Sequence, residues 1–352
     1  MKRRHLLGGM ACVAAWPAFT PASALADTAW ANTGAPPLNL LVAGPTGGQT
    51  SRWGNACALA LSQCLPGAPA IMPQPVGGLD GVTGANQLDA LVVPDGKTAA
   101  ILPGAALIAY LTGDSRVHFD PTRWLPLLAG VNSGVLMLRG PTMPDIATLR
   151  AAGPLRIAAD QPQSRDLAAL LGLARLGLAT APVFGLRDRD AKTGAFIDGE
   201  VDAVFLCGEG VPEDIAPLTA AGAVPFFSIG ALAPDGTMGP DPFFPNLANA
   251  RSLGPAISPD MDAAYQAAAA AAQLDFLLVL PKLTDPGAAA LWSQAADQAA
   301  TAPALAAAAS ASSVSLQPAL ALAGALAALA LQPTAQSSLL AYLAKSYGWQ
   351  PS

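Results

Sequence analysis

The chain has 352 residues, and a hydrophobic content of 52% with only 12% charged residues excludes a disordered protein. Its formal charge of −6 argues against nucleic acid or an anionic membrane surface as a partner, although a small anion would respond only to the local field of its cleft. The length suffices for two domains of ordinary size.

The first 26 residues have the pattern of a secretory signal peptide. A basic start at Lys2, Arg3 and Arg4 precedes an apolar run, and Ala24-Leu25-Ala26 forms an A-x-A cleavage site. We expect export to the periplasm by the standard secretory or the twin-arginine route. Cleavage removes three basic residues and no acidic one, which moves the formal charge from −6 to −9. Residues 27–37 are predicted as a linker.

A strand, a glycine turn and a helix follow. Leu38 to Ala43 is an apolar run typical of a buried strand, Gly44 to Gly48 forms a turn, and the apolar period after Gln49 predicts an amphipathic helix. Such a unit presents free backbone N–H groups and the positive end of a helix dipole, which together suit an anion. No lysine follows the glycine pair, so a phosphate-binding P-loop is disfavoured.

We therefore predict a bound carboxylate at this turn, held by Thr46, Gly47, Gly48, Gln49, Thr50 and Ser51. The alternative is that the glycines only turn the strand tightly into the helix.

Short strands and helices continue to alternate after this unit. Strands are expected near residues 70–76 and 98–102, with glycine breaks at strand ends such as Gly104. This alternation predicts an open α/β sheet whose ligands bind outside the carboxyl ends of the strands, and it brings Gly104 into the candidate site. Gly77 to Gly84 has the spacing G-G-x-x-G-x-x-G rather than G-x-G-x-x-G, so no dinucleotide cofactor is expected.

The residues for common catalytic and metal chemistry are scarce. No G-x-S-x-G occurs, and after signal cleavage His118 is the single histidine. Cys57 and Cys64 would lie roughly 10 Å apart along one helix, too far for a disulfide, and Cys207 is remote in sequence. We expect no catalysis, no metal site and no disulfide.

Four motifs carry a resemblance to a known family. In order they are Val42 to Gly48, Gly77 to Gly84, Pro94 to Thr98 and His118 to Trp124. They resemble the P-x-x-P-G-G, G-A-G-G-x-x-G, P-D-G-Y-T and Y-D-P-x-x-D-F motifs of the substrate-binding receptors of tripartite tricarboxylate transporters, the Bug-type periplasmic receptors. The resemblance implies an α/β fold, namely a two-domain periplasmic binding protein of the Venus-flytrap, type II-like kind, with open mixed sheets and flanking helices.

The second half resembles the family more loosely. The resemblance implies ligand contacts from a loop at residues 160–164, from the 182–187 loop and from the strand entry at 199–205, and thus from Gln163, Ser164, Phe184 and Asp202. Relatives carry P-Y-K-G where this chain has Pro182-Val183-Phe184-Gly185. Arg187 either replaces the missing lysine at the cleft or belongs to a charged surface turn.

The resemblance also implies a domain division and a function. Residues 38–138 and 230–352 would form the first, discontinuous domain and residues 139–229 the second. The protein would capture a small carboxylate and deliver it to membrane permease subunits, as a monomer. Relatives often carry aspartate at the position of Ser51, so we expect a plain carboxylic acid rather than an amino acid. The alternative is a receptor-like sensor or scaffold no longer coupled to transport.

Overall fold

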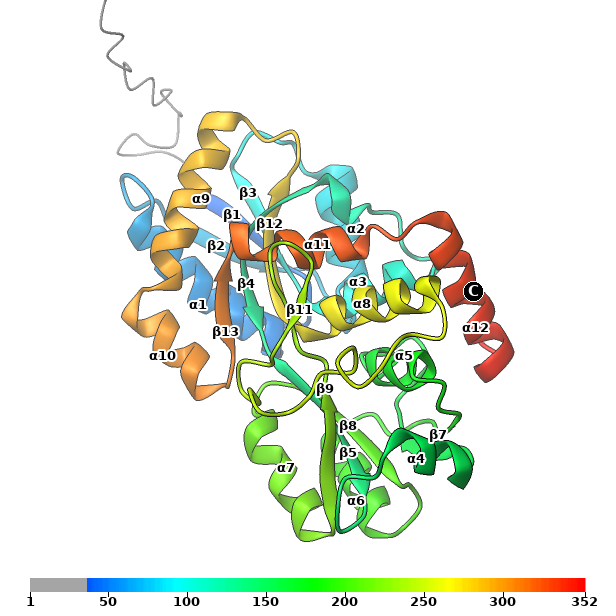
Figure 1. The fold of residues 1–352 in the computed structure, drawn as a ribbon. Helices are drawn as coiled ribbons and strands as arrows, with labels where there is room; N and C mark the ends of the chain where they lie inside the picture. Colours follow the sequence, from blue (N-terminus) through cyan, green and yellow to red (C-terminus); the bar gives the residue numbers. More distant parts are fainter. Residues whose placement is uncertain (1–36, 352) are drawn as a thin grey trace, which may run out of the picture.

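Two β-sheets surrounded by helices make up the protein, the first in the upper half of Figure 1 and the second in the lower half. The structure is a computed structural model that describes residues 37–351. The predicted signal peptide and the linker up to residue 36 lie outside the described residues. The predicted α/β architecture, with open mixed sheets and flanking helices, is confirmed.

The first sheet has the strand order β13-β4-β12-β3-β1-β2. Its strands are β1 (Leu38–Val42), β2 (Ile71–Pro75), β3 (Thr98–Leu102), β4 (Trp124–Val131), β12 (Leu274–Pro281) and β13 (Ser315–Pro318). β1 runs parallel to β2 and β3, whereas β12 is antiparallel to both of its neighbours, β3 and β4. The central strands are apolar almost throughout because helices cover both faces of the sheet.

The second sheet has the order β7-β6-β8-β5-β9. Its strands are β5 (Ser133–Arg139), β6 (Leu155–Ala158), β7 (Thr180–Val183), β8 (Ala203–Gly208) and β9 (Ala223–Ser228). The chain enters this sheet through Asn132, between β4 and β5, and leaves it after β9. β5 pairs with β8 and β9, so the change of sheet comes earlier than the domain boundary we predict after Leu138.

The helices and one small hairpin complete the fold. The hairpin β10 (Ala231–Leu232) and β11 (Met238–Gly239) lies on the returning connection. The helices are α1 (Gln49–Cys64), α2 (Val82–Leu91), α3 (Gly104–Leu111), η1 (Pro121–Arg123), α4 (Ile146–Ala152), α5 (Leu167–Arg175), α6 (Arg189–Ile197), α7 (Val211–Ala220), α8 (Pro259–Gln273), α9 (Pro286–Ala300), α10 (Pro303–Ala311), η2 (Ala319–Leu322), α11 (Ala323–Leu329) and α12 (Pro333–Tyr347).

Helix α8 joins the two halves of the molecule. It is mostly alanine, it is fully buried from Ala267 to Ala272, and Ser258 caps its start by accepting a hydrogen bond from the Met261 amide at 3.1 Å. It packs against α5 beside the second sheet and against α3, α11 and α12 beside the first. Small side chains allow several helices to approach one helix closely, and one hydrophobic core continues from the first sheet into the second.

The C-terminal helices are part of this core. Within residues 37–351 no single helix is long and apolar enough to cross a membrane. The two segments Ala319–Leu329 and Pro333–Tyr347, which are bent by 67° relative to each other, reach that length and apolar composition only when they are taken together. Leu322, Leu329, Leu339 and Leu343 are buried in the shared core, as expected for helices that pack on α8.

Candidate functional site

A cavity of about 1050 Å³ lies between the two sheets. Most of its walls come from the segments that follow β1, β2 and β3 in the first sheet and β6, β7 and β8 in the second, and the end of α10 at Ala311 and Ser312 adds to them. Each of these segments begins at the carboxyl end of its strand, where α/β sheets bind their ligands. The volume is at the upper end of the range for small-molecule sites.

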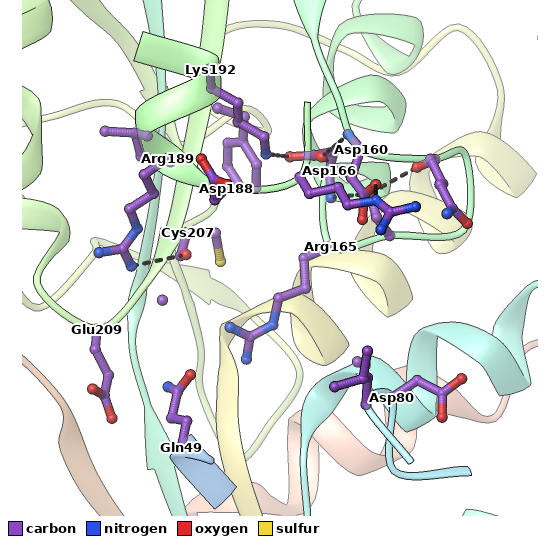
Figure 2. A pocket seen from close by; sticks show the side chains of 18 of the residues that line it. Gln49, Asp80, Asp160, Arg165, Asp166, Asp188, Arg189, Lys192, Cys207 and Glu209 are labelled. Atoms are coloured by element: carbon purple, nitrogen blue, oxygen red, sulfur yellow. Dashed lines mark hydrogen bonds and ion pairs between the residues drawn. The ribbon is translucent and has the colours of Figure 1, made fainter. Parts of the chain in front are cut away.

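The loop at residues 160–164, which we predict as a ligand contact, forms one wall of the cavity together with Arg165 and Asp166 (Figure 2). The Asp166 carboxylate fixes its shape: it accepts the Asp160 amide at 2.8 Å and the Ser164 hydroxyl at 3.1 Å, and it forms a buried ion pair with Lys192 of α6. Gln163 donates its side-chain amide to Gln161 at 2.9 Å. These contacts leave Arg165 directed into the cavity.

The Arg165 guanidinium is a cation of this wall with spare hydrogen-bond donors. One of its terminal nitrogens donates to the Leu274 carbonyl, and the other lies 3.9 Å from the Asp275 carboxyl. Among residues 37–351 no carboxylate accepts a hydrogen bond from it. A guanidinium has five N–H donors arranged to bind a carboxylate bidentately, so Arg165 can hold a ligand anion.

The other cations of the cavity wall face acids of the protein itself. They are Arg52 with Glu209, Arg116 with Asp80 and Asp114, Arg187 with Asp160, Arg189 with Asp214, and Lys192 with Asp166. The Arg187 pair is the loosest at 3.8 Å, and the Arg187 side chain is 76% exposed. Apart from Arg165 and the exposed Arg187, the cations of the wall are therefore closely paired with acids of the protein.

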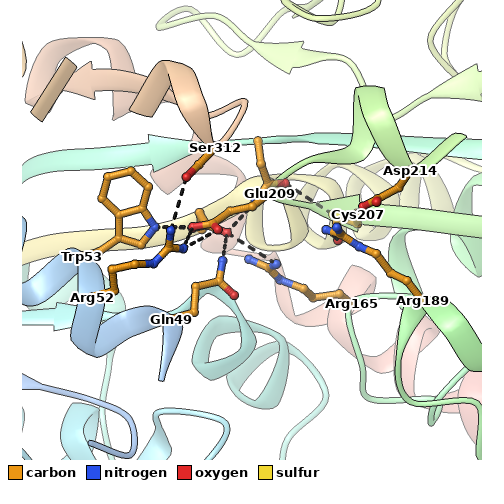
Figure 3. Close-up of polar contacts among 11 residues, drawn as sticks. Gln49, Arg52, Trp53, Arg165, Arg189, Cys207, Glu209, Asp214 and Ser312 are labelled. Atoms are coloured by element: carbon orange, nitrogen blue, oxygen red, sulfur yellow. Dashed lines mark hydrogen bonds and ion pairs between the residues drawn. The ribbon is translucent and has the colours of Figure 1, made fainter. Parts of the chain in front are cut away.

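On the opposite wall, two acidic side chains share one indole N–H (Figure 3). Trp53 Nε1 of α1 donates to Glu209 Oε1 at 2.6 Å and to Asp275 Oδ2 at 2.7 Å. Asp275 also accepts from Gln49 at 2.6 Å and from Asn132 at 3.1 Å. Glu209 follows β8 of the second sheet, so its ion pair with Arg52 and its bond to Trp53 connect the two walls.

The two acids divide their charge unequally. Asp275 is only 3% exposed, and burial raises the pKa of its carboxyl, opposed by the Arg165 cation and reinforced by Glu209. Burial would also raise the pKa of Glu209, but hydrogen bonds from Arg52, Asp275 and Trp53 outweigh it and hold that pKa below its ordinary value. Asp275 is therefore the member of the pair that binds a proton more readily, and Glu209 is the member that more readily carries the negative charge.

The predicted residues of the α1 turn lie near this wall. Gly47 adopts φ +76°, which explains the glycine, and Gly48 forms the N-cap without a side-chain cap bond. Gln49 lines the cavity, whereas Thr50 and Ser51 are 8% and 6% exposed and are not among its lining residues. Thr46 and Gly47 are exposed, and Gly48 is half-buried. The α1 turn thus contributes a side chain, Gln49, to the cavity wall.

Of the remaining residues predicted for the site, some line the cavity and others lie outside its lining. Gln163 and Ser164 line the cavity, as described above. Gly104 packs against the backbone, since a Cβ there would lie 2.1 Å from the Ala271 carbonyl oxygen. Phe184 is exposed and meets the Tyr347 ring edge-on at 5.8 Å between centroids. Asp202 forms a two-pronged pair with Arg156, at 2.6 and 2.8 Å, outside the cavity lining.

Replacement of Asp202 by asparagine tests that placement. The Arg156 guanidinium holds the pKa of Asp202 below its ordinary value, so this stabilising contribution is present above about pH 3.8 and is lost as the pH falls through the lowered pKa. We expect Asp202→Asn to reduce the free energy of unfolding by at most about 1 kcal/mol at neutral pH and to leave carboxylate affinity unchanged. Urea unfolding and calorimetric titration would check both, and a large loss of affinity would return Asp202 to the site.

Five residues of the site were not predicted from the sequence: Arg52, Trp53, Arg165, Glu209 and Asp275. Two of them carried a local signal: Glu209 lies between two glycines at the end of a strand, and Asp275 interrupts an otherwise apolar strand. Arg165 directly follows the predicted Gln163-Ser164 contact.

Several solved structures of other proteins resemble this chain in fold. No family model and no curated protein matches the chain. A TctC solute binding protein from Polaromonas matches with a TM-score of 0.66 and 15% identity, over 88% of this chain and 98% of that chain. The periplasmic binding protein BugD matches with a TM-score of 0.52 and 12% identity, over 88% and 97% of the two chains. The chain has the fold of a periplasmic solute-binding protein.

A third structure of this fold contains a carboxylic acid. MatC from Rhodopseudomonas palustris, solved with bound malate, matches with a TM-score of 0.52 and 15% identity, over 87% of this chain and 98% of that chain. At such identities the likeness extends to the fold, and the chemistry of this cleft rests on its own residues.

Proposed function

We propose that this protein is a periplasmic receptor that captures a small carboxylate between its two α/β domains and delivers it to a membrane permease. The observation that carries the proposal is the Arg165 guanidinium, which points into a cavity of about 1050 Å³ with donors to spare. Bound malate in MatC, a protein of the same fold, supports a carboxylate as the ligand. The predicted export signal supports a periplasmic location.

We propose binding without chemical conversion of the ligand. His118 lies outside the cavity lining, and in residues 37–351 no group of three histidine, cysteine or acidic side chains is arranged to hold a metal ion. Cys207 lines the cavity, but burial raises the pKa of its thiol to about 11, which keeps it protonated and weakly nucleophilic at neutral pH.

A thermal-shift screen tests the proposal. The panel would contain straight-chain mono-, di- and tricarboxylates, aromatic acids and acidic amino acids, with matched amides and alcohols as neutral controls. A ligand at ~100 times its dissociation constant adds ~2.7 kcal/mol to the free energy of unfolding, which raises the melting temperature by several degrees. We expect at least one acid, and none of the neutral analogues, to do so. If no acid stabilises the protein, the receptor proposal fails.

A further inference from the structure

Glu209 places a carboxylate of the protein itself between the two walls of the cleft. It follows β8 of the second sheet, yet it is bound by Arg52 and by the Trp53 indole N–H of α1, beside the first sheet. A guanidinium together with an indole N–H is a set of donors suited to an anion. The anion position on this wall is therefore already filled by a residue of the chain.

Most cations of the cavity wall are paired with carboxylates of the protein. Arg116, Arg187, Arg189 and Lys192 each face a carboxylate of the protein, and Arg52 faces Glu209. The nearest carboxyl to Arg165 is Asp275, at 3.9 Å and without a hydrogen bond between the two side chains, so the Arg165 guanidinium keeps donors available to a ligand. The most weakly paired cations of the wall are Arg165 and Arg187, and the Arg187 side chain is 76% exposed to solvent, which screens its charge. Arg165 can thus bind one ligand carboxylate, whereas a second one inside the cleft would meet cations already paired with carboxylates of the protein and would be repelled by those carboxylates.

We propose that Glu209 is a built-in carboxylate that completes the anion position at Arg52 and Trp53, so that the cleft selects acids with one carboxylate over dicarboxylates of the same length. This inference rests on the proposed receptor function and adds the class of ligand. Removing Glu209 frees the Arg52 guanidinium of its carboxylate and leaves the Trp53 N–H with Asp275 as its acceptor, which creates a second anion position at Arg52, opposite Arg165. The selectivity of the cleft should then change toward dicarboxylates.

The experiment compares two matched pairs of acids, butanoate with succinate and pentanoate with glutarate, by calorimetric titration at neutral pH. Wild type is expected to bind each monocarboxylate at least about 10-fold more tightly than its dicarboxylate partner, since a hydrogen bond to a charged group accounts for about that factor. Glu209→Ala is expected to shift the ratio by about 10-fold or more toward the dicarboxylate. Glu209→Gln keeps the shape of the side chain without its charge and should shift the ratio in the same direction.

Glu200→Ala is the matched control, because Glu200 is exposed on the second-sheet side, outside the cavity lining. Its ratio should equal that of wild type, and the melting temperature of each variant would show that it is folded. An unchanged ratio in both Glu209 variants, or an equal loss of affinity for both kinds of acid, would overturn the inference and leave the receptor function standing. Failure of all four acids to bind any variant or wild type would overturn the selectivity inference, while the wider screen decides the receptor function separately.

Discussion

Replacing Arg165 by glutamine is expected to weaken the binding of a monocarboxylate by about 100-fold or more. A bidentate guanidinium–carboxylate contact contains two charge-assisted hydrogen bonds, each contributing ~1.5–3 kcal/mol, and glutamine retains neither the charge nor the fork of donors. Arg165→Lys keeps the charge but not the planar geometry, so an intermediate loss of about 10-fold is expected. Titration calorimetry on the acid that gives the largest thermal shift would measure both variants.

Arg187→Gln is the control for this prediction. Arg187 lines the same cavity, but its side chain is 76% exposed and 3.8 Å from its acidic partner. Its loss should cost about fivefold in affinity at most, as for exposed ion pairs. If Arg187→Gln weakens binding more than Arg165→Gln, the ligand carboxylate binds at the rim of the cleft, and Arg187 replaces the lysine of the family after all.

The second large effect is expected at Asp275. Asp275→Ala removes the acceptor of Trp53, Gln49 and Asn132 at a buried position, and leaving such partners unpaired costs about 3–5 kcal/mol of the free energy of unfolding. Asp275→Asn keeps the shape of the side chain and one acceptor oxygen, so it should retain more of the stability than Asp275→Ala. Chemical denaturation at neutral pH would compare the two variants, and equal losses would show that the retained acceptor oxygen plays no part.

The difference in the free energy of unfolding between Asp275→Asn and wild type should depend on pH. The pKa of Asp275 is raised above its ordinary 3.8, so the folded state binds this proton more tightly than the unfolded chain does. The stabilising contribution is complete below about pH 3.8 and is lost as the pH rises through the raised pKa. Asparagine does not titrate, so the stability of Asp275→Asn relative to wild type should improve as the pH rises above 4. A difference that stays constant with pH would contradict the raised pKa of Asp275.

The fold could be predicted largely because its signals are local. The apolar run from Leu38 and the helical period after Gln49 specify a strand and a helix in residues that are neighbours in sequence, and β1 and α1 occupy those ranges. Glycine at position 47 is required by a positive φ, which the turn pattern indicated. The position of the cavity at the strand carboxyl ends followed from the alternation of strands and helices.

The site was harder to predict because its contacts are remote in sequence. Trp53 meets Glu209 and Asp275 across 156 and 222 residues, and no local pattern pairs them. A hydroxyl at a helix start can face a ligand or be buried, and the helical period does not distinguish these outcomes for Thr50 and Ser51. The orientation of Arg165 depends on a loop whose carboxylate anchor, Asp166, is held by a lysine from a later helix.

The alanine surface of α8 also bears on how such a cleft would open. Alanine side chains end at Cβ, so α8 presents few long side chains to the leucines of α5. Two specific contacts nevertheless join the helices: the Tyr265 ring lies against Gly172 of α5, where a Cβ would approach it to 3.2 Å, and Arg175 of α5 forms an ion pair with Asp262 of α8 at 2.6 Å. Sliding of α5 along α8 during opening would therefore have to break the Arg175–Asp262 pair, which makes this pair the contact that limits such a motion.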